Sequence, residues 1–181
     1  MNTGLISTRY ATALLDYAIE RGEQDKVYEA VKMLSQMFWE VPRFGEALHN
    51  PILSPAEKKK LILTASGGEV SEAWDRFIDL LLENNRIEKL HYIALRFQDL
   101  YRDKNHILSA TLTTAVDTDK SVYERLKSII AKQTGGTVEM TQAVDPSIVG
   151  GFILQIGDNR WDASVASQLR RIKNELKEIN N

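Results

Sequence analysis

The residues with the most capacity for chemistry lie in the last third of the chain, between residues 145 and 172. Asp162 and Ser164 could act as an acid and a nucleophile, and Gly150 and Gly151 could bring backbone N–H groups close to a phosphate. Both patterns are incomplete, because no histidine lies near Ser164 in the sequence and no G-x-S-x-G motif surrounds it. A helix cap at Ser164 and a strand bulge or close backbone contact at the glycine pair explain these residues better.

The other candidate sites are weaker. His49, His91 and His106 lie in different predicted elements and lack the spacing of metal ligands. The sequence contains no cysteine and no G-x-x-x-x-G-K-[ST] phosphate loop, and the lysine run at 58–60 is typical of a solvated helix face. We therefore predict no catalytic residue, no cofactor and no metal site, and we expect a protein that is not an enzyme.

Length and charge restrict the class of protein further. A chain of 181 residues accommodates one or two domains. The net charge of −2 and the isoelectric point of about 6.0 argue against a nucleic-acid-binding protein. No apolar run approaches the ~18 residues of a membrane-spanning helix, and the first residues have neither a signal-peptide nor a transit-peptide pattern. We therefore expect a cytoplasmic protein that could still bind to a membrane complex.

The hydrophobic period changes once along the chain. Helical periodicity and capping signals predict helices at 3–21, 25–41, 43–49, 55–65, 71–83 and 87–103. After residue 105 the pattern predicts strands at 107–116, 137–144, 148–156 and 160–162, with helices at 120–133 and after Ser164. The predicted fold is mainly α: an N-terminal six-helix bundle at 1–105, followed by a small α/β C-terminal domain at 106–181.

The helices at 3–21 and 71–83 have unusually broad apolar faces. Each face covers about twice the arc of ~100° that an ordinary surface helix needs. Two interpretations remain open from the residues alone. The helices could be buried on two sides, or they could line a groove that binds an amphipathic helix of a partner.

Four stretches of the sequence together resemble one protein family. They read RYATALLDYAIERG, NPILSPAEKKKLI, FIDLLLENNRIEKLHYIALRFQDLY and DPSIVGGFILQIGDNRWDASVASQL. This family is the delta subunit of F-type ATP synthases, which is called the oligomycin sensitivity conferral protein in mitochondria. The resemblance extends over nearly the whole chain. Two positions differ from the family pattern: Asn85 and Ala163 stand where glycine is common.

The resemblance implies a fold and a function. It implies a non-catalytic stator subunit of the proton-translocating ATP synthase. Such a subunit is expected at the cytoplasmic face of the membrane, where it is held only by the other subunits of the complex. The N-terminal bundle is expected to bind the N-terminal helices of alpha subunits, and the C-terminal domain the C-terminal ends of the b subunits. The family's groove between its first and fifth helices implies a contact set of Tyr10, Ala13, Leu14, Tyr17, Phe77, Ile78 and Leu81. The alternatives are a helical adaptor of another complex and, with less support, a small ligand-binding protein.

Overall fold

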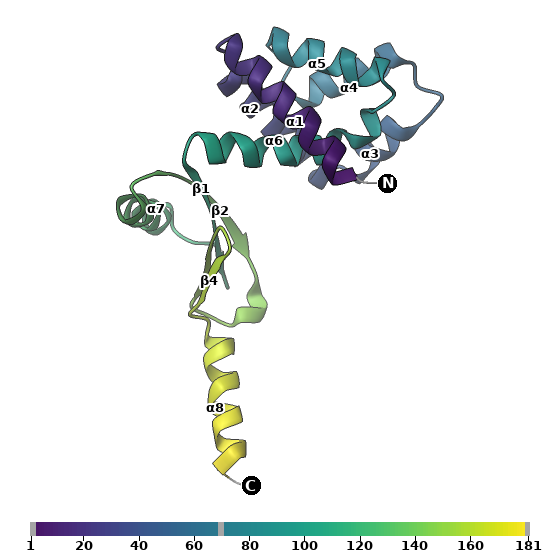
Figure 1. The fold of residues 1–181 in the computed structure, drawn as a ribbon. Helices are drawn as coiled ribbons and strands as arrows, with labels where there is room; N and C mark the ends of the chain where they lie inside the picture. Colours follow the sequence, from purple (N-terminus) through teal and green to yellow (C-terminus); the bar gives the residue numbers. More distant parts are fainter. Residues whose placement is uncertain (1–2, 69–70, 180–181) are drawn as a thin grey trace. The chain divides into compact units, whose positions relative to one another are not determined.

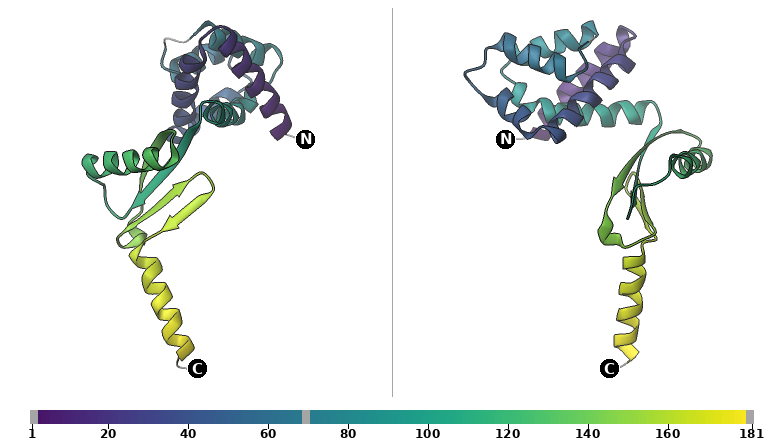
Figure 2. Two further views of the ribbon diagram at one scale, coloured as in Figure 1. Left: turned by 60° about the vertical axis from the view of Figure 1, so that its left-hand side comes forward. Right: turned by 180° about the vertical axis from the view of Figure 1, so that it is seen from behind.

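The computed structural model describes residues 3–68 and 71–179. Contacts within the chain divide it into two units, residues 1–101 and residues 102–181. The first unit is helical and the second combines a sheet with helices, as Figures 1 and 2 show. The boundary between the units lies near the end of the helix that finishes at Lys104, close to residue 105, where the hydrophobic period of the sequence changes.

The first unit is built from α-helices. They are α1 (Thr3–Glu20), α2 (Gln24–Glu40), α3 (Pro42–His49), α4 (Pro55–Ala65), α5 (Glu72–Glu83) and α6 (Leu90–Lys104). The predicted helix at 87–103 begins instead as a 3-10 turn, η1 (Ile87–Lys89). The chain enters this turn from Asn85, whose φ of 53° is left-handed, so a regular helix starts only a few residues later.

Local signals in the sequence explain where two of these helices begin. Ser54 and Glu57 form a reciprocal capping box at the start of α4, where Pro55 occupies the first helical position. Ser71 caps α5 by accepting a hydrogen bond from the Trp74 amide. The beginning of α1 has weaker support, because its first turn contains Gly4 and no acidic residue.

The core of the first unit surrounds α5. Trp74, Ile78 and Leu81 of this helix are completely buried, and α5 contacts α1, α2 and α4. The indole N–H of Trp74 donates a hydrogen bond of 3.0 Å to the buried hydroxyl of Ser66, so this large side chain is buried without an unpaired polar atom. No described helix is long and apolar enough to cross a membrane.

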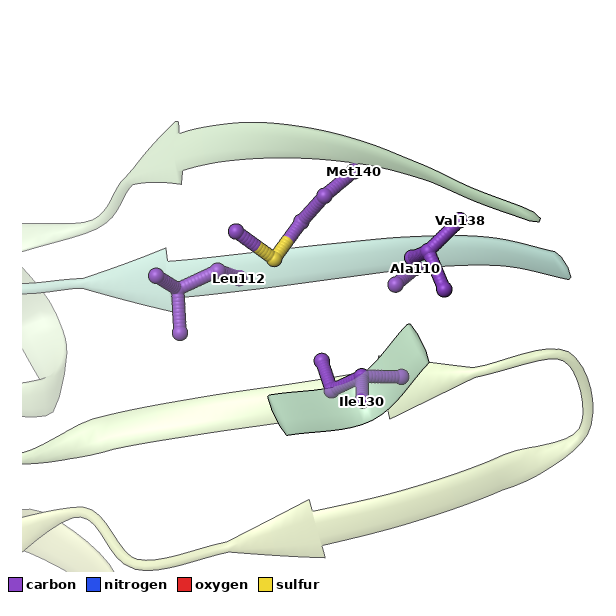
Figure 3. Packing of buried hydrophobic residues seen from close by; sticks show 5 residues of the cluster. All are labelled: Ala110, Leu112, Ile130, Val138 and Met140. Atoms are coloured by element: carbon purple, nitrogen blue, oxygen red, sulfur yellow. The ribbon is translucent and has the colours of Figure 1, made fainter. Parts of the chain in front are cut away.

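The second unit contains a four-stranded mixed sheet in the order β2-β1-β3-β4. Its elements are β1 (Ile107–Thr114), α7 (Lys120–Thr134), β2 (Thr137–Val144), the 3-10 turn η2 (Pro146–Ile148), β3 (Phe152–Ile156), β4 (Asn159–Asp162) and α8 (Val165–Ile179). β1 pairs in parallel with β2 and antiparallel with β3. Ile130 of α7 packs against the sheet in a small core with Ala110, Leu112, Val138 and Met140, shown in Figure 3.

The predicted strand at 148–156, with a glycine bulge inside it, is wrong in its first half. The strand begins only at Phe152, and the preceding residues form a turn in which Val149 and Gly151 have φ values of 67° and 73°. A methyl group on Gly151 would collide with the carbonyl oxygen of Ala163. The glycine therefore allows the backbone before β3 to lie directly against the backbone before α8.

Replacing Gly151 with alanine should destabilise the second unit by about 2 kcal/mol or more, because a left-handed conformation and a backbone collision both oppose the new side chain. Hydrogen exchange of the β1, β2 and β3 amides should accelerate, while exchange in α2 and α5 stays unchanged. Gly157→Ala is the matched control: Gly157 is also left-handed (φ 54°), but no atom lies within 4 Å of a β-carbon there. Equal effects of the two substitutions would show that the collision is unimportant.

Candidate partner-binding surfaces

An open groove lies between α1 and the end of α5. It has a volume of about 420 Å³ and is lined by Ile6, Arg9, Tyr10, Ala13, Leu80 and Arg86. Its apolar residues come from the first eleven residues of α1 and the C-terminal half of α5, so the two helices run antiparallel past each other. Leu80 is 44% exposed in it, which is a large exposure for a leucine beside a packed core.

Contacts at the opposite end of the same helix pair hold α1 and α5 together. Arg21, directly after α1, forms an ion pair with Glu72 at the start of α5. The Glu23 carboxylate accepts a hydrogen bond of 2.9 Å from the Ala73 amide. The pair is therefore tied at one end and open at the end that forms the groove.

The structure separates the seven predicted contact residues into three kinds. Tyr10 and Ala13 line the groove. Tyr17 is half-buried and lies beneath Arg21, whose guanidinium carbon is 5.5 Å from the centre of its ring. The other four side chains are buried in the core and do not line the groove; these are Leu14, Phe77, Ile78 and Leu81.

The breadth of the apolar face on α5 thus has mainly a structural cause. The helix is enclosed by α1, α2 and α4, so most of its apolar arc faces the core. Sequence reasoning did not assign Ile6, Arg9, Leu80 or Arg86 to the groove. A usable signal was present at Leu80, because consecutive leucines at 80–82 point in successive directions and cannot all face one core.

A second groove of about 410 Å³ lies on the other side of α1, against α6. Its lining combines small residues of α1 with larger residues of α6: Gly4, Ser7, Thr8, Tyr92, Leu95, Arg96 and Asp99. Arg96 and Asp99 approach each other to 4.0 Å within this groove. The positive charge here is therefore accompanied by a carboxylate of the same helix.

A different surface is present on the second unit. Val165, Leu169, Ile172 and Leu176 of α8 are between 37% and 56% exposed. Their alternating spacing of four and three residues is that of the seam of a coiled coil, and it places them on one face of the helix. This row, the α8 stripe, is large enough to pack against another helix.

The residues that suggested chemistry in the sequence hold the first turn of α8. The Asp162 carboxylate accepts hydrogen bonds from the Ser164 amide at 3.0 Å and the Ser167 hydroxyl at 2.9 Å. Ser164 is 1% exposed and its oxygen accepts a bond from the Ser167 amide, as an N-cap does. The Val165 amide donates to the Gly150 carbonyl at 3.0 Å. This network, the α8 base, joins the turn before β3 to the helix.

Two of the three histidines make contacts within the helical unit. His49 bonds to the Gly45 carbonyl at the end of α3, and the ring of His91 lies 4.5 Å from that of Phe38. Burial lowers the pKa of His91 below its ordinary value. Across residues 3–68 and 71–179, no three histidine, aspartate or glutamate side chains form a group that could hold a metal ion.

The fold and these surfaces define a protein of two units: a helical one with an open groove and a small α/β one that ends in an amphipathic helix. Comparisons with known proteins identify the family. Residues 6–176 match the model of the ATP synthase delta (OSCP) subunit family. The chain belongs to this family, and its function is that of a stator subunit of the F-type ATP synthase.

Individual relatives match over nearly the full length. The chain is 42% identical to ATP synthase subunit delta of Phocaeicola vulgatus, over 97% of this chain and 96% of the relative. It is 43% identical to that of Bacteroides fragilis, with the same coverage, and 40% identical to that of Lactobacillus acidophilus, over 94% of each chain. A chain in the cryo-EM structure of the Toxoplasma gondii mitochondrial ATP synthase hexamer shares the fold, with a TM-score of 0.72 at 20% identity over 94% of this chain and 96% of that chain.

Asp162→Ala should loosen the first turn of α8, because two hydrogen bonds to the carboxylate are lost. Amide exchange at Ser164 and Ser167 should accelerate relative to the unaltered chain, whereas Asp158→Ala in the β3–β4 turn should leave it unchanged.

The hydrogen bonds from Ser164 and Ser167 lower the pKa of Asp162. The contribution of the carboxylate is therefore present above the ordinary carboxyl pKa of ~3.9 and is lost as the pH falls through the lowered value of the folded state. The difference between the chain and its variant should thus disappear in acid, and a difference that persists there would contradict this role.

Proposed function

We propose that the chain fulfils its stator role as a non-catalytic link between two partners. In this proposal the N-terminal unit is a six-helix bundle that binds the N-terminal helices of alpha subunits. The C-terminal unit binds the C-terminal ends of the b subunits, so that the catalytic head resists rotation with the central shaft. The protein is then placed at the cytoplasmic face of the membrane by the complex alone. The observation that carries the proposal is the presence of a separate apolar surface on each unit.

The groove between α1 and α5 suits one face of an amphipathic helix. Its floor rests on buried side chains, including Phe77, whose ring meets that of Tyr10 edge-on with the ring centres 6.4 Å apart. A partner side chain placed there meets a wall that is already packed. Burial of apolar area contributes roughly 25 cal/mol per Å², less the costs of association, and a prearranged wall keeps those costs low.

The α8 stripe suits a helical partner of a different kind. Helices that present apolar residues at alternating spacings of four and three pack side by side over several turns. A long stalk helix offers this geometry over its whole length. The α8 base supports the contact because it fixes the first turn of the helix by side-chain and backbone bonds.

No chemical step is required of such a link. It has to stay bound while torque acts on the head, and differences in affinity between related complexes arise mostly from dissociation rates. Two sites on one chain add avidity, because release of one partner leaves the other in place.

Leu80→Asp should weaken binding of a peptide from the alpha-subunit N-terminus at least about tenfold, because a carboxylate replaces an apolar contact within the groove. Its circular dichroism spectrum should match that of the unaltered chain, since Leu80 is 44% exposed. Leu14→Asp is the informative contrast: Leu14 is 1% exposed, and an unpaired buried carboxylate should unfold the helical unit. Titration calorimetry with both variants distinguishes a residue that contacts the peptide from one that is needed for the folded core. Full peptide binding by Leu80→Asp would rule out this groove.

Leu169→Asp in the α8 stripe should abolish co-purification with the b subunits and leave binding of the alpha-subunit peptide unchanged. Asn174→Asp introduces the same residue on the opposite face of the same helix and should have no effect on either partner. Pull-down from membranes that carry each variant, with calorimetry on the purified chain, measures both contacts. Equal loss of the b subunits with the two variants would show that the charge, and not the stripe, is responsible.

A further inference from the structure

Two arginines line the groove between α1 and α5, and no carboxylate lines it. Arg9 is exposed on α1, and Arg86 is half-buried directly after the turn that follows α5. Within the described part of the chain, neither guanidinium lies within 4.0 Å of a carboxylate. The groove therefore combines an apolar floor with two unneutralised positive charges.

Some arginines of the chain have a carboxylate partner, whereas Arg43, Arg125 and Arg170 resemble Arg9 and Arg86 in having none within 4.0 Å among the described residues. Arg76 lies 2.6 Å from Glu72, Arg102 lies 3.1 Å from Glu139, and Arg21 and Arg96 also have carboxylate partners. Acidic residues are not scarce, because the chain has 25 of them against 23 basic ones. What distinguishes Arg9 and Arg86 is that both line one groove to which no carboxylate contributes.

A helix seated in the groove would remove water from both guanidinium groups. Burying a charge is costly unless an opposite charge replaces the water, and guanidinium groups match carboxylates in two-point hydrogen bonds. A lysine or arginine on the seated helix would instead meet a like charge in a medium of reduced dielectric constant. The two arginines thus favour a helix with acidic residues over a helix with basic residues, whereas the apolar floor of the groove does not distinguish between them.

We propose that Arg9 and Arg86 make this groove selective for an amphipathic helix that carries Asp or Glu beside its apolar stripe. The proposal rests on the helix-binding role of the groove and adds the chemistry of the helix that is accepted. Arg86 has an alternative structural role, since a cation after the end of α5 complements the helix dipole. In that role its replacement would change stability without changing the preference for acidic helices.

The test uses the full chain and two designed fluorescent peptides. Both form amphipathic helices with an identical leucine and alanine stripe, and they differ only in having glutamate or lysine at the flanking positions. By fluorescence anisotropy at low salt, the glutamate peptide should bind at least about tenfold more tightly than the lysine peptide. The ratio should shrink as salt is added, because exposed charges are screened.

Variants then locate the selectivity. The double variant Arg9→Glu, Arg86→Glu should reverse the preference, and each of Arg9→Gln and Arg86→Gln should reduce it. Arg96→Glu is the matched control, because Arg96 lies in the neighbouring groove beside Asp99 and should leave the ratio unchanged. Circular dichroism of every variant confirms that the helical unit is folded.

The outcomes distinguish the proposal from the function on which it rests. Equal binding of the two peptides to the unaltered chain overturns the charge selectivity and leaves the groove as a helix-binding site. The charge selectivity is also overturned if Arg96→Glu changes the ratio of the two affinities as much as the groove variants do, because the general surface charge then explains that ratio. If neither peptide binds and the alpha-subunit peptide also fails, both the selectivity and the proposed use of the groove are wrong.

Discussion

The packing of α1 against α5 is the contact on which the helical unit depends. The rings of Tyr10 and Phe77 meet between the two helices, and the bonds of Arg21 and Glu23 to the first turn of α5 fix their relative position. Because the helices are antiparallel and tied at one end, their other ends form a groove whose walls are set by the core beneath it. The candidate binding surface is thus a consequence of the same contact that stabilises the fold.

Much of the fold could be predicted because local signals agree with the final structure. The helix at 55–65 and the strand at 137–144 have the predicted bounds, since a capping box marks the first and glycines precede the second. At Gly150 and Gly151 the predicted close backbone contact is present, at Ala163, but the predicted strand is too long because this contact with a residue twelve positions away replaces regular pairing. A groove is present between the two helices for which one is predicted, but its lining residues were only partly predictable. Which of Leu80, Leu81 and Leu82 faces outward depends on how α1, α2 and α4 surround α5.

The second unit shows how a motif that suggests chemistry can have a mechanical use. Asp162, Ser164 and Ser167 have the side chains of a hydrolytic site, yet each of their bonds holds the first turn of α8. Together with the bond from the Val165 amide to the Gly150 carbonyl, they fix the start of α8 against the turn before β3. In a protein that transmits force, such a junction serves the function more directly than a reactive group would.

The first turn of α1 has a consequence for the subunit before assembly. It contains Gly4 and lacks an acidic residue, and Leu5 beside it is 68% exposed. The far end of α1 is bonded to α5 through Arg21 and Glu23, whereas the first turn has no acidic side chain to complement the helix dipole. Local opening of α1 should therefore start at the end that borders the groove, so a partner seated there meets the least restrained part of the helix.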